Sequence, residues 1–281
     1  MPNQTLKALS KVITLALMDF PLSTTRTSQQ VMRDTIHALL MRELKTRFGA
    51  KKLGYFWAFM EPAAQASTMA ILFSLIGRNS VAGVPIALFL ISGILPFKFF
   101  SKLLPQLAQA VSANKSLFAY RQVTAIDPII TRLIIEAVTF VVVYIVILMV
   151  MAWLGFEVWP HDLLALLGIS ALLLILGTGI GLIMCSAVAH WEDASKILAM
   201  VMMPMFMISG IFFCATMIPS QYWYLLDWNP IFHVIELSRD AMFASYTTPV
   251  GNWQYVGMSA LVSVSVGLML YQVNRNRFIT T

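Results

Sequence analysis

Six apolar windows, each long enough to cross a bilayer, constrain this chain more than any other feature. A helix needs about 20 mainly apolar residues to cross about 30 Å of hydrocarbon. The windows cover residues 55–76, 84–111, 129–154, 163–189, 197–218 and 253–273. Hydrophobic residues make up 59% of the 281 positions and charged residues only 11%, far from the usage of soluble domains. We therefore predict an all-α integral membrane protein with six transmembrane helices.

The placement of Lys and Arg predicts the orientation of these helices, because cytoplasmic loops carry an excess of both. The loops at 115–121 and 190–196 are basic, whereas residues 157–162 contain neither Lys nor Arg. Both termini should therefore be cytoplasmic. The terminal basic residues are Lys7, Lys11, Arg26, Arg33, Arg42, Lys45, Arg47, Lys51, Lys52, Arg275 and Arg277. The net charge of +6 is thus distributed over span ends, which does not favour a nucleic-acid partner.

Three regions divide the chain: residues 1–30, 31–54 and 55–281. The first is an N-terminal extension whose apolar run, 12–18, is short and has no small-residue cleavage site after it, so we do not expect a cleaved signal peptide. The second should form an amphipathic helix along the cytoplasmic surface, serving either as a membrane anchor or as a docking element. Its apolar positions are Met32, Ile36, Leu39, Leu40 and Leu44. The third is the transmembrane domain.

Residues 217–252 are too polar to span the membrane, although they follow the fifth window directly. They are rich in Trp, Tyr and Pro, and Trp and Tyr favour the membrane interface. We expect short helices that enter the outer leaflet and return, with an ordinary external loop as the alternative. The residues of interest in this external re-entrant segment are Tyr222, Trp223, Trp228, His233, Glu236 and Arg239.

Charged residues inside the apolar windows are the first functional candidates. Glu61 precedes Pro62 near the start of the first window, and such an acid is either functional or half of a structural ion pair. Lys98 and Lys102 are four residues apart and share a helix face. They could present cations to an anionic substrate, or they could extend to a headgroup region. The prolines of this second window, at 96 and 105, predict a kinked or tilted helix.

Other spacings indicate packing. Arg132 and Glu136 are four residues apart on the third window and can pair. Gly177 and Gly181 form a small face that permits close helix packing. Cys185 and Cys214 belong to no Cys/His cluster, so no metal site is predicted.

Signatures of enzymes are missing from the sequence. It contains no G-x-x-x-x-G-K-[ST] phosphate loop, no HExxH and no GxSxG. The tetrad HWED at 190–193 lies in a short loop without a positioned nucleophile, which favours docking over catalysis.

Three separated motifs carry a resemblance to a known family. The first is RELKTR at 42–47 with LGYFW at 53–57 and EP at 61–62. The second is ANKSLFAYR at 113–121 with ID at 126–127. The third is IPSQYW at 218–223, followed by WNP at 228–230, HV at 233–234 and ELSR at 236–239. From about residue 31 onward, the sequence resembles the KpsM-type capsular polysaccharide export permeases, which are membrane subunits of type 2 ABC exporters.

The resemblance implies a homodimer of six-span subunits in the bacterial inner membrane, which exports a lipid-linked capsular polysaccharide. Two copies of a cytosolic ABC ATPase of the KpsT type would bind ATP and Mg, and this chain would bind no cofactor itself. A periplasmic polysaccharide co-polymerase and an outer-membrane export protein would carry the polymer onward. ATPase coupling would fall to Arg42, Glu43, Lys45, Arg47, Asn114, Lys115, Phe118, Tyr120, Arg121, Asp127, His190, Trp191, Glu192 and Asp193.

Sugar rings slide on aromatic faces with polar tips, so an aromatic cluster could line the substrate path. Tyr55, Phe56, Trp57 and Phe59 stand at the expected cytoplasmic entrance, and an interfacial aromatic belt is the alternative. Glu61, Lys98 and Lys102 complete the candidate path. Two rival functions remain open: a type 2 ABC permease for O-antigen, teichoic acid or a small drug, and an integral-membrane glycolipid enzyme.

Overall fold

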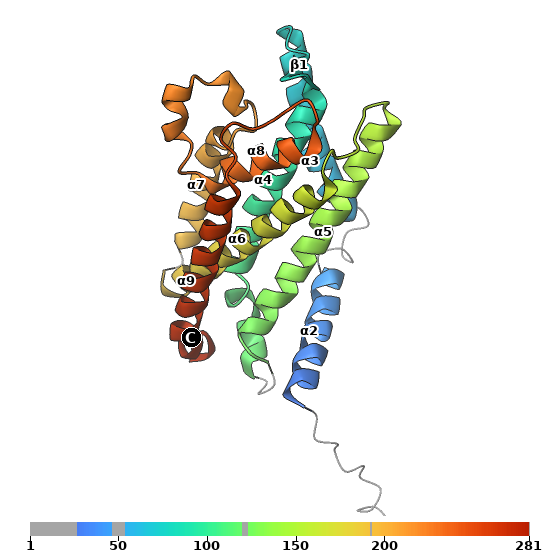
Figure 1. The fold of residues 1–281 in the computed structure, drawn as a ribbon. Coiled ribbons are helices and arrows are strands. Elements are labelled where there is room, and N and C mark those ends of the chain that lie inside the picture. Colours follow the sequence, from blue (N-terminus) through green and yellow to red (C-terminus); the bar gives the residue numbers. More distant parts are fainter. Residues whose placement is uncertain (1–26, 47–53, 120–122, 192, 281) are drawn as a thin grey trace, which may run out of the picture.

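The computed structural model describes residues 27–46, 54–119, 123–191 and 193–280, and in these ranges the chain is an elongated bundle of helices (Figure 1). The first described helix is α2 (Ser28–Leu44). It begins at a capping box: the Gln30 backbone N–H donates to the Thr27 hydroxyl, and the Thr27 backbone N–H donates to the Gln30 side chain. Residues 47–53 lie outside the described ranges, and α3 (Gly54–Leu75) follows them.

A hairpin joins α3 to the next helix. Its two short antiparallel strands, β1 (Ser80–Val81) and β2 (Val84–Pro85), are connected by a two-residue turn. Its central residues, Ala82 and Gly83, have φ of 51° and 79°. Positive φ at both central positions is typical of the tight hairpin turns that match strand twist. The chain then enters α4 (Ile86–Ala108), the 3-10 helix η2 (Ser112–Ala119) and α5 (Ile126–Trp153).

The remaining elements complete the bundle. They are α6 (Leu163–His190), α7 (Ala194–Ile208), the 3-10 helices η3 (Ala215–Met217) and η4 (Ser220–Leu225), α8 (Pro230–Met242) and α9 (Trp253–Thr280). Asp162 caps α6 by accepting from the Ala165 backbone N–H at 2.9 Å. Asn229 caps α8 in the same way through the Ile231 N–H, with Pro230 at the first helical position.

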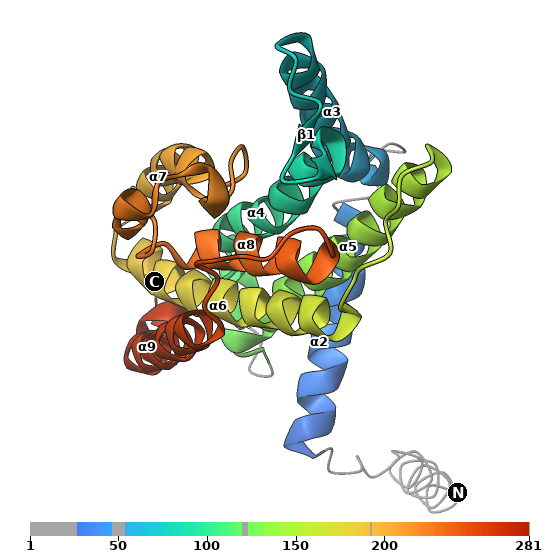
Figure 2. The same ribbon diagram turned by 45° about the horizontal axis from the view of Figure 1, so that its top comes forward.

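The two ends of the bundle differ. One end carries α2 and the C-terminal end of α9, and the β1–β2 hairpin stands at the other (Figure 1). We call the first the α2 end and the second the hairpin end. Turning the molecule shows α8 lying across α4 and α6 (Figure 2), and α8 also contacts α9. α2 packs along α5, where Leu39 and Glu43 are buried and Met32 is exposed.

Four of the helices in the described ranges are long and apolar enough to cross a membrane: α4, α5, α6 and residues 253–275 of α9. The first predicted window, 55–76, corresponds to α3, and the fifth, 197–218, overlaps α7. The fifth window needs a correction because α7 ends at Ile208. Gly210 has φ of +75°, which breaks the helix, and residues 209–218 continue as turns and η3. The 15 residues of α7 reach only about 22 Å.

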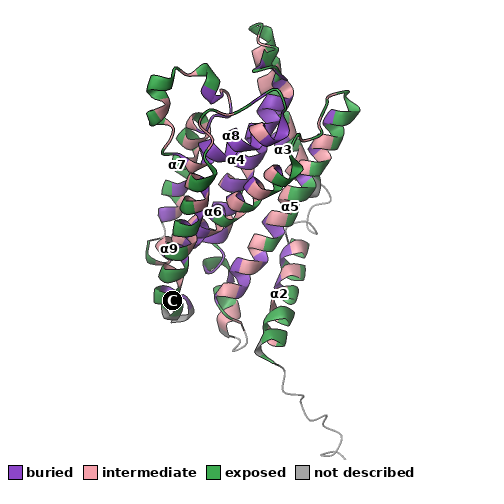
Figure 3. Cartoon of the chain, viewed as in Figure 1, coloured by how far each residue is buried: buried purple, intermediate pink, exposed green. Residues whose placement is uncertain are grey.

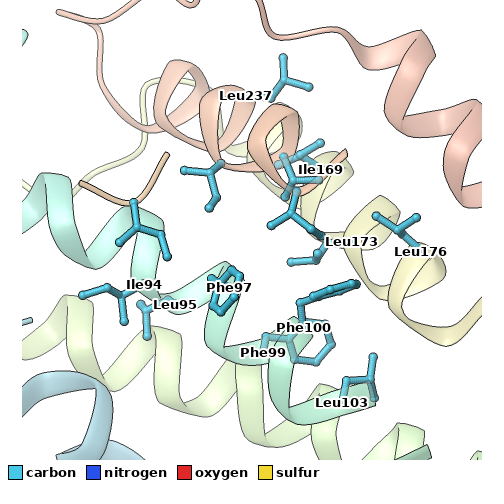
Figure 4. Close-up of a cluster of buried hydrophobic side chains, with 14 of the residues drawn as sticks. Ile94, Leu95, Phe97, Phe99, Phe100, Leu103, Ile169, Leu173, Leu176 and Leu237 are labelled. Atoms are coloured by element: carbon cyan, nitrogen blue, oxygen red, sulfur yellow. The ribbon is translucent and has the colours of Figure 1, made fainter. Parts of the chain in front are cut away.

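The core centres on α4, which is buried along most of its length (Figure 3). Its apolar side chains meet those of α6 and α8 (Figure 4). The cluster contains Ile94, Leu95, Phe97, Phe99, Phe100 and Leu103 of α4, Ile169, Leu173 and Leu176 of α6, and Leu237 of α8.

Glycines let α6 approach its neighbours closely. A Cβ at Gly177 would lie 2.8 Å from the Leu103 side chain, and one at Gly181 would lie 2.6 Å from Leu107. The small face predicted at these two positions therefore packs on α4. Gly179, on another face, receives α9: a Cβ there would lie 2.4 Å from the backbone of Ser263. Close packing through small residues is typical of membrane helices.

Candidate functional site

A junction of α2, α4 and α5 forms at the α2 end around Arg132. The Arg132 Nε lies 3.1 Å from Glu43 Oε1, and its Nη1 donates to the Gln106 carbonyl oxygen at 2.8 Å. The side chains of Arg132 and Glu43 are 11% and 10% exposed, so this pair is far better shielded than a surface ion pair. Arg132 therefore fastens α2 to both α4 and α5.

A second contact joins α2 to η2. Arg42 donates to the Asn114 Oδ1, and the Asn114 Nδ2 donates to the Ala110 carbonyl oxygen at 2.8 Å. Asn114 is almost completely buried, although η2 is only a short connecting element between α4 and α5. The structure thus brings together two elements that the sequence proposed separately for ATPase coupling: the amphipathic helix and the loop after the second window.

The other coupling candidates differ in accessibility. Asp127 is buried, and its Oδ2 accepts from the Thr124 N–H at 2.7 Å and from the Thr124 hydroxyl at 2.9 Å. Through these two contacts it organises the start of α5. Trp191 is 55% exposed in the connection between α6 and α7, where Asp193 pairs with Lys196 at 2.7 Å.

Of the remaining coupling residues, four lie in the described ranges and four do not. His190 ends α6, with its Nδ1 2.9 Å from the Ser186 carbonyl oxygen. Lys45 and Lys115 are exposed, and Phe118 is partly buried. The other four candidates, Arg47, Tyr120, Arg121 and Glu192, lie outside the described residues.

The charged candidates for the substrate path line one pocket between α3, α4 and α5. Its volume is about 330 Å³, and Glu61, Lys98, Lys102 and Glu136 contribute to its wall. The Lys98 Nζ lies 2.5 Å from Glu61 Oε1, so the carboxylate beside Pro62 does have a cationic partner. Lys102 Nζ lies 3.9 Å from Glu136 Oε2. Both lysines therefore face carboxylates on neighbouring helices, and the pocket is balanced in charge.

The aromatic candidates stand at the start of α3. Phe56 and Trp57 are 50% and 62% exposed, and their rings meet edge to face with centroids 6.1 Å apart. Phe59 is partly buried. The Tyr55 side chain lies outside the described parts of the chain.

A buried polar network at the hairpin end is the main feature that sequence reasoning missed. Arg239 of α8 donates to the carbonyl oxygens of Gly210, Ile211 and Phe213 at 2.7, 3.0 and 2.9 Å. Its guanidinium carbon lies 3.7 Å from the centroid of the Phe89 ring. Arg239 and Glu236 are fully buried, and their side chains approach to 3.5 Å. The turn after α7 is thus held to α4 and α8.

Glu236 also accepts from the Tyr246 hydroxyl at 2.5 Å and from the Thr248 hydroxyl at 3.0 Å. Burial lowers the pKa of Arg239 to about 10, while the Glu236 carboxylate acts in the opposite direction, so the guanidinium stays charged at neutral pH. Burial raises the pKa of the Tyr246 phenol, and the Glu236 charge adds to this, so the phenol stays a donor. In the sequence, the feature that could have indicated this buried network is the group of three charged residues at 236, 239 and 240 within a short segment.

The rest of the external segment is more exposed. Trp223 donates through Nε1 to the Ile218 carbonyl oxygen at 3.0 Å, while Tyr222 and Trp228 are about half exposed. His233 is buried, with Nε2 2.9 Å from the Asp227 carbonyl oxygen. His233, Glu236 and Arg239 thus lie inside the bundle, not on a membrane-facing surface. No cluster of metal-ligating side chains occurs in the described ranges.

Comparison with known proteins now defines the family. The family model described as "ABC-2 type transporter" matches residues 34–243, which include α3 to α8. The chain belongs to the ABC-2 type transporter family.

Within this family, similarity to individual members extends along most of the chain. The chain is 37% identical over 257 residues to the polysialic acid transport protein KpsM of Escherichia coli, covering 91% of this chain and 99% of that protein. It is 27% identical to the capsule polysaccharide export inner-membrane protein CtrC of Neisseria meningitidis, covering 85% and 90% of the two chains. It is 26% identical to BexB of Haemophilus influenzae, which has the same description, covering 88% and 94%.

Three residues of this ABC-2 transporter were not among the candidates. Gln106 and Arg132 join the coupling elements, and Glu136 lines the charged pocket. Sequence reasoning noted that Arg132 and Glu136 share a helix face and can pair with each other. The contacts that the structure gives for these two residues are to other helices: Arg132 contacts α2 and α4, and Glu136 contacts α4.

Proposed function

We propose that this chain is the membrane-spanning subunit of an ATP-driven exporter that moves lipid-anchored capsular polysaccharide across the bacterial inner membrane. The observation that carries this proposal is the similarity to the polysialic acid transport protein, which extends over nearly all of both chains. The two further relatives are both described as capsule polysaccharide export proteins of the inner membrane. A transport subunit is therefore favoured over a glycolipid enzyme.

The proposed subunit has six spans. Four are the long apolar helices, and α3 and α7 supply the other two. In a homodimer, α3 and α7 would gain a partner for the large apolar side chains that they expose, among them Ile71, Leu75 and Met203. The segment 217–252 would enter the outer leaflet at the hairpin end. The basic α2 end would face the cytoplasm together with both termini.

Energy would come from two copies of a separate cytosolic ABC ATPase carrying ATP and Mg. The absence of a phosphate loop from the sequence supports this division of labour. The contacts of α2 with η2 and α5 support a rigid docking unit, since Arg42 and Arg132 would make the helix and the loop move together. The exposed Trp191 would add a second docking point.

The charged pocket between α3, α4 and α5 would meet an anionic polymer through exchange of ion-pair partners. The Glu61 side chain is 68% exposed, and exposed ion pairs contribute little to stability. An arriving anion can therefore take over Lys98 at small cost. Replacing Lys98 and Lys102 together by Gln should slow export of an anionic polymer, while Arg275→Gln, at an exposed arginine of α9 outside the pocket, serves as the control. Equal export by the two variants would contradict this role.

A periplasmic polysaccharide co-polymerase and an outer-membrane export protein would take the polymer onward. The hairpin end would be the surface that meets the first of them, since the α2 end is assigned to the ATPase.

Disruption of the gene in its native cell tests the proposal directly. A polymer-specific stain, applied with and without permeabilisation, reports where the polysaccharide lies. We expect full-length polymer trapped inside the cell and its return to the surface when the wild-type gene is restored. Normal surface polymer in the disrupted strain would contradict the capsule assignment and would favour another cargo, such as O-antigen, teichoic acid or a small drug.

A further inference from the structure

Two hollows meet at the connection between α5 and α6. The first has a volume of about 600 Å³ and lies between the β1–β2 hairpin, this connection and the segment that follows α8. The second has a volume of about 480 Å³ and lies between α5 and α6, where its lining is mostly apolar. We call them the hairpin-end hollow and the α5–α6 groove. Trp159 lines both, so the two spaces meet at this side chain.

The connection sorts its side chains between the two hollows. Glu157 and His161 line the hairpin-end hollow, whereas Val158 and Pro160 line the α5–α6 groove. Charged and titratable groups therefore face one space and apolar groups face the other, with Trp159 between them. Such a pair of spaces fits an amphiphilic molecule, whose polar end and apolar end need different surroundings.

Exposed side chains place this region at the edge of the membrane. Trp153, at the end of α5, and Trp159 are 85% and 90% exposed, and Trp is favoured at the level of the lipid headgroups. Large apolar side chains of the groove, such as Ile145 and Leu167, are more than half exposed. The groove thus opens towards the acyl chains of the bilayer, and the hairpin-end hollow lies beside the headgroups.

The walls of the hairpin-end hollow are held together by contacts within the protein. The Asp162 backbone N–H donates to the Ala241 carbonyl oxygen at 2.8 Å, which attaches the connection to the end of α8. The hairpin packs on the segment after α8, since a Cβ at Gly83 would lie 3.4 Å from the Ser245 Cβ. Three separate parts of the chain therefore form one hollow.

The charge of the hollow selects against an anionic ligand. Among the described residues that line it, none is Lys or Arg. Glu157 is exposed, and within the described ranges its carboxylate has no hydrogen bond or ion pair. A second carboxylate, that of Asp240, lies close enough to His161 for the two charges to interact. The hollow therefore offers an unpaired carboxylate to a cation.

We propose that the hairpin-end hollow and the α5–α6 groove together bind a phospholipid with a primary ammonium headgroup, such as phosphatidylethanolamine. The ammonium has three N–H donors, and the Glu157 carboxylate accepts one of them in a charge-assisted hydrogen bond. The ring of Trp159 attracts the same cation. The His161 imidazole and the Ser245 hydroxyl donate to the phosphate oxygens. An acyl chain fills the groove.

A simpler explanation is that any lipid covers the groove and that Trp159 is only an interfacial anchor. This accounts for the apolar lining and for the exposed ring. It does not account for Glu157, because Asp and Glu contribute little to the orientation of a membrane protein. The volumes of both spaces also lie within the range of about 300–1,000 Å³ usual for small-molecule sites.

Lipid selectivity is measured on the full chain, purified in a mild detergent together with any bound ATPase. The sample is incubated with equal amounts of phosphatidylethanolamine, phosphatidylcholine and phosphatidylglycerol that carry the same acyl chains. Native mass spectrometry then counts how much of each lipid is retained. Phosphatidylcholine keeps the positive charge but has no N–H donor, and phosphatidylglycerol lacks the cation altogether.

The headgroup is tested with Glu157→Gln. We expect the wild type to retain phosphatidylethanolamine about tenfold better than the other two lipids, and Glu157→Gln to lose this preference, because it removes the charge-assisted hydrogen bond. Glu157→Asp keeps the carboxylate and should keep most of the preference. The control is Asp34→Asn, which removes one negative charge from an exposed position on α2 and should behave as the wild type.

The acyl chain is tested with Leu167→Trp, which places a large ring in the groove without changing a headgroup contact. It should lower the retention of phosphatidylethanolamine several-fold. The control is Leu261→Trp at a similarly exposed position of α9 outside the groove, which should leave retention unchanged.

Three results would overturn the proposal. The first is a wild type that retains the three lipids equally, which would show that any lipid covers the groove. The second is equal selectivity in Glu157→Gln and Asp34→Asn. The third is a Leu167→Trp variant that loses a second copy of the chain and keeps its lipid, which would assign the groove to a subunit interface. These measurements rest on the membrane location alone, so they remain informative even if capsule export fails.

Discussion

Replacing Arg239 by Met should destabilise the protein more than any exposed substitution. The change leaves the carbonyl oxygens of Gly210, Ile211 and Phe213 without their donor, and it leaves the Glu236 carboxylate without its cation in a fully buried place. Met has a similar volume and can keep the contact with the Phe89 ring, so cavity formation contributes little. The effect should therefore be mainly electrostatic.

The expected loss is about 4 kcal/mol in the free energy of unfolding, since breaking a buried ion pair from one side typically costs about 3–5 kcal/mol. Glu236→Gln should cost less, because the Tyr246 and Thr248 hydroxyls can still donate to the remaining carbonyl oxygen. The double variant should be less destabilised than the sum of the two single variants, because it leaves no unpaired charge.

The assay is unfolding of the purified chain in mixed micelles, followed by tryptophan fluorescence, with Arg275→Gln as an exposed arginine control. A loss of only about 1 kcal/mol for Arg239→Met would refute the reasoning, since that is a typical effect of an ordinary point mutation. Strict additivity in the double variant would refute the assignment of the cost to an unpaired Glu236.

Two further predictions concern helix contacts. Gly179→Ala should lower the midpoint of thermal unfolding, because a Cβ there would lie 2.4 Å from the Ser263 backbone and would force α6 and α9 apart. The control is Gly257→Ala, which should leave the midpoint unchanged because no atom lies within 4 Å of the added Cβ. Equal midpoints for the two variants would contradict the packing argument. Glu43→Arg and Arg132→Glu should each reduce export and ATPase stimulation by placing like charges together, and the double exchange should restore both readouts if the 3.1 Å pair joins α2 to α5. Failure of the exchange to recover either readout would show that the pair is not needed for coupling.

Helix positions were predictable where a local property decides them. The windows 129–154 and 163–189 became α5 at 126–153 and α6 at 163–190, because long apolar runs between polar loops leave few alternatives. The early end of α7 was not predictable from hydropathy. Residues 209–218 are as apolar as a span, and only the positive φ of Gly210 and the turn that it permits show that the helix has stopped.

The residues of the candidate site were easier to predict from the sequence than the contacts between them. Glu61 was expected to have either a function or a basic partner, and Lys98 provides the partner. Arg132 could be placed on a helix face, but its contact with Glu43 joins residues 89 positions apart, which no local spacing reveals. The same holds for Arg239, whose partner Ser92 is 147 positions away. Long-range polar contacts depend on how helices pack, and helix packing has no short sequence signature.

The central position of α4 limits how this molecule can change shape. α4 packs against α3, α5, α6, α7 and α8, and most of its residues are buried. Displacing it would break apolar contacts on all sides at once, whereas α3 and α7 each contact few neighbours and expose large apolar side chains. Local motion is cheapest where contacts are few. α4 is therefore the helix that is hardest to displace. We expect a passage for a long polymer to open most readily by movement of the outer helices relative to α4.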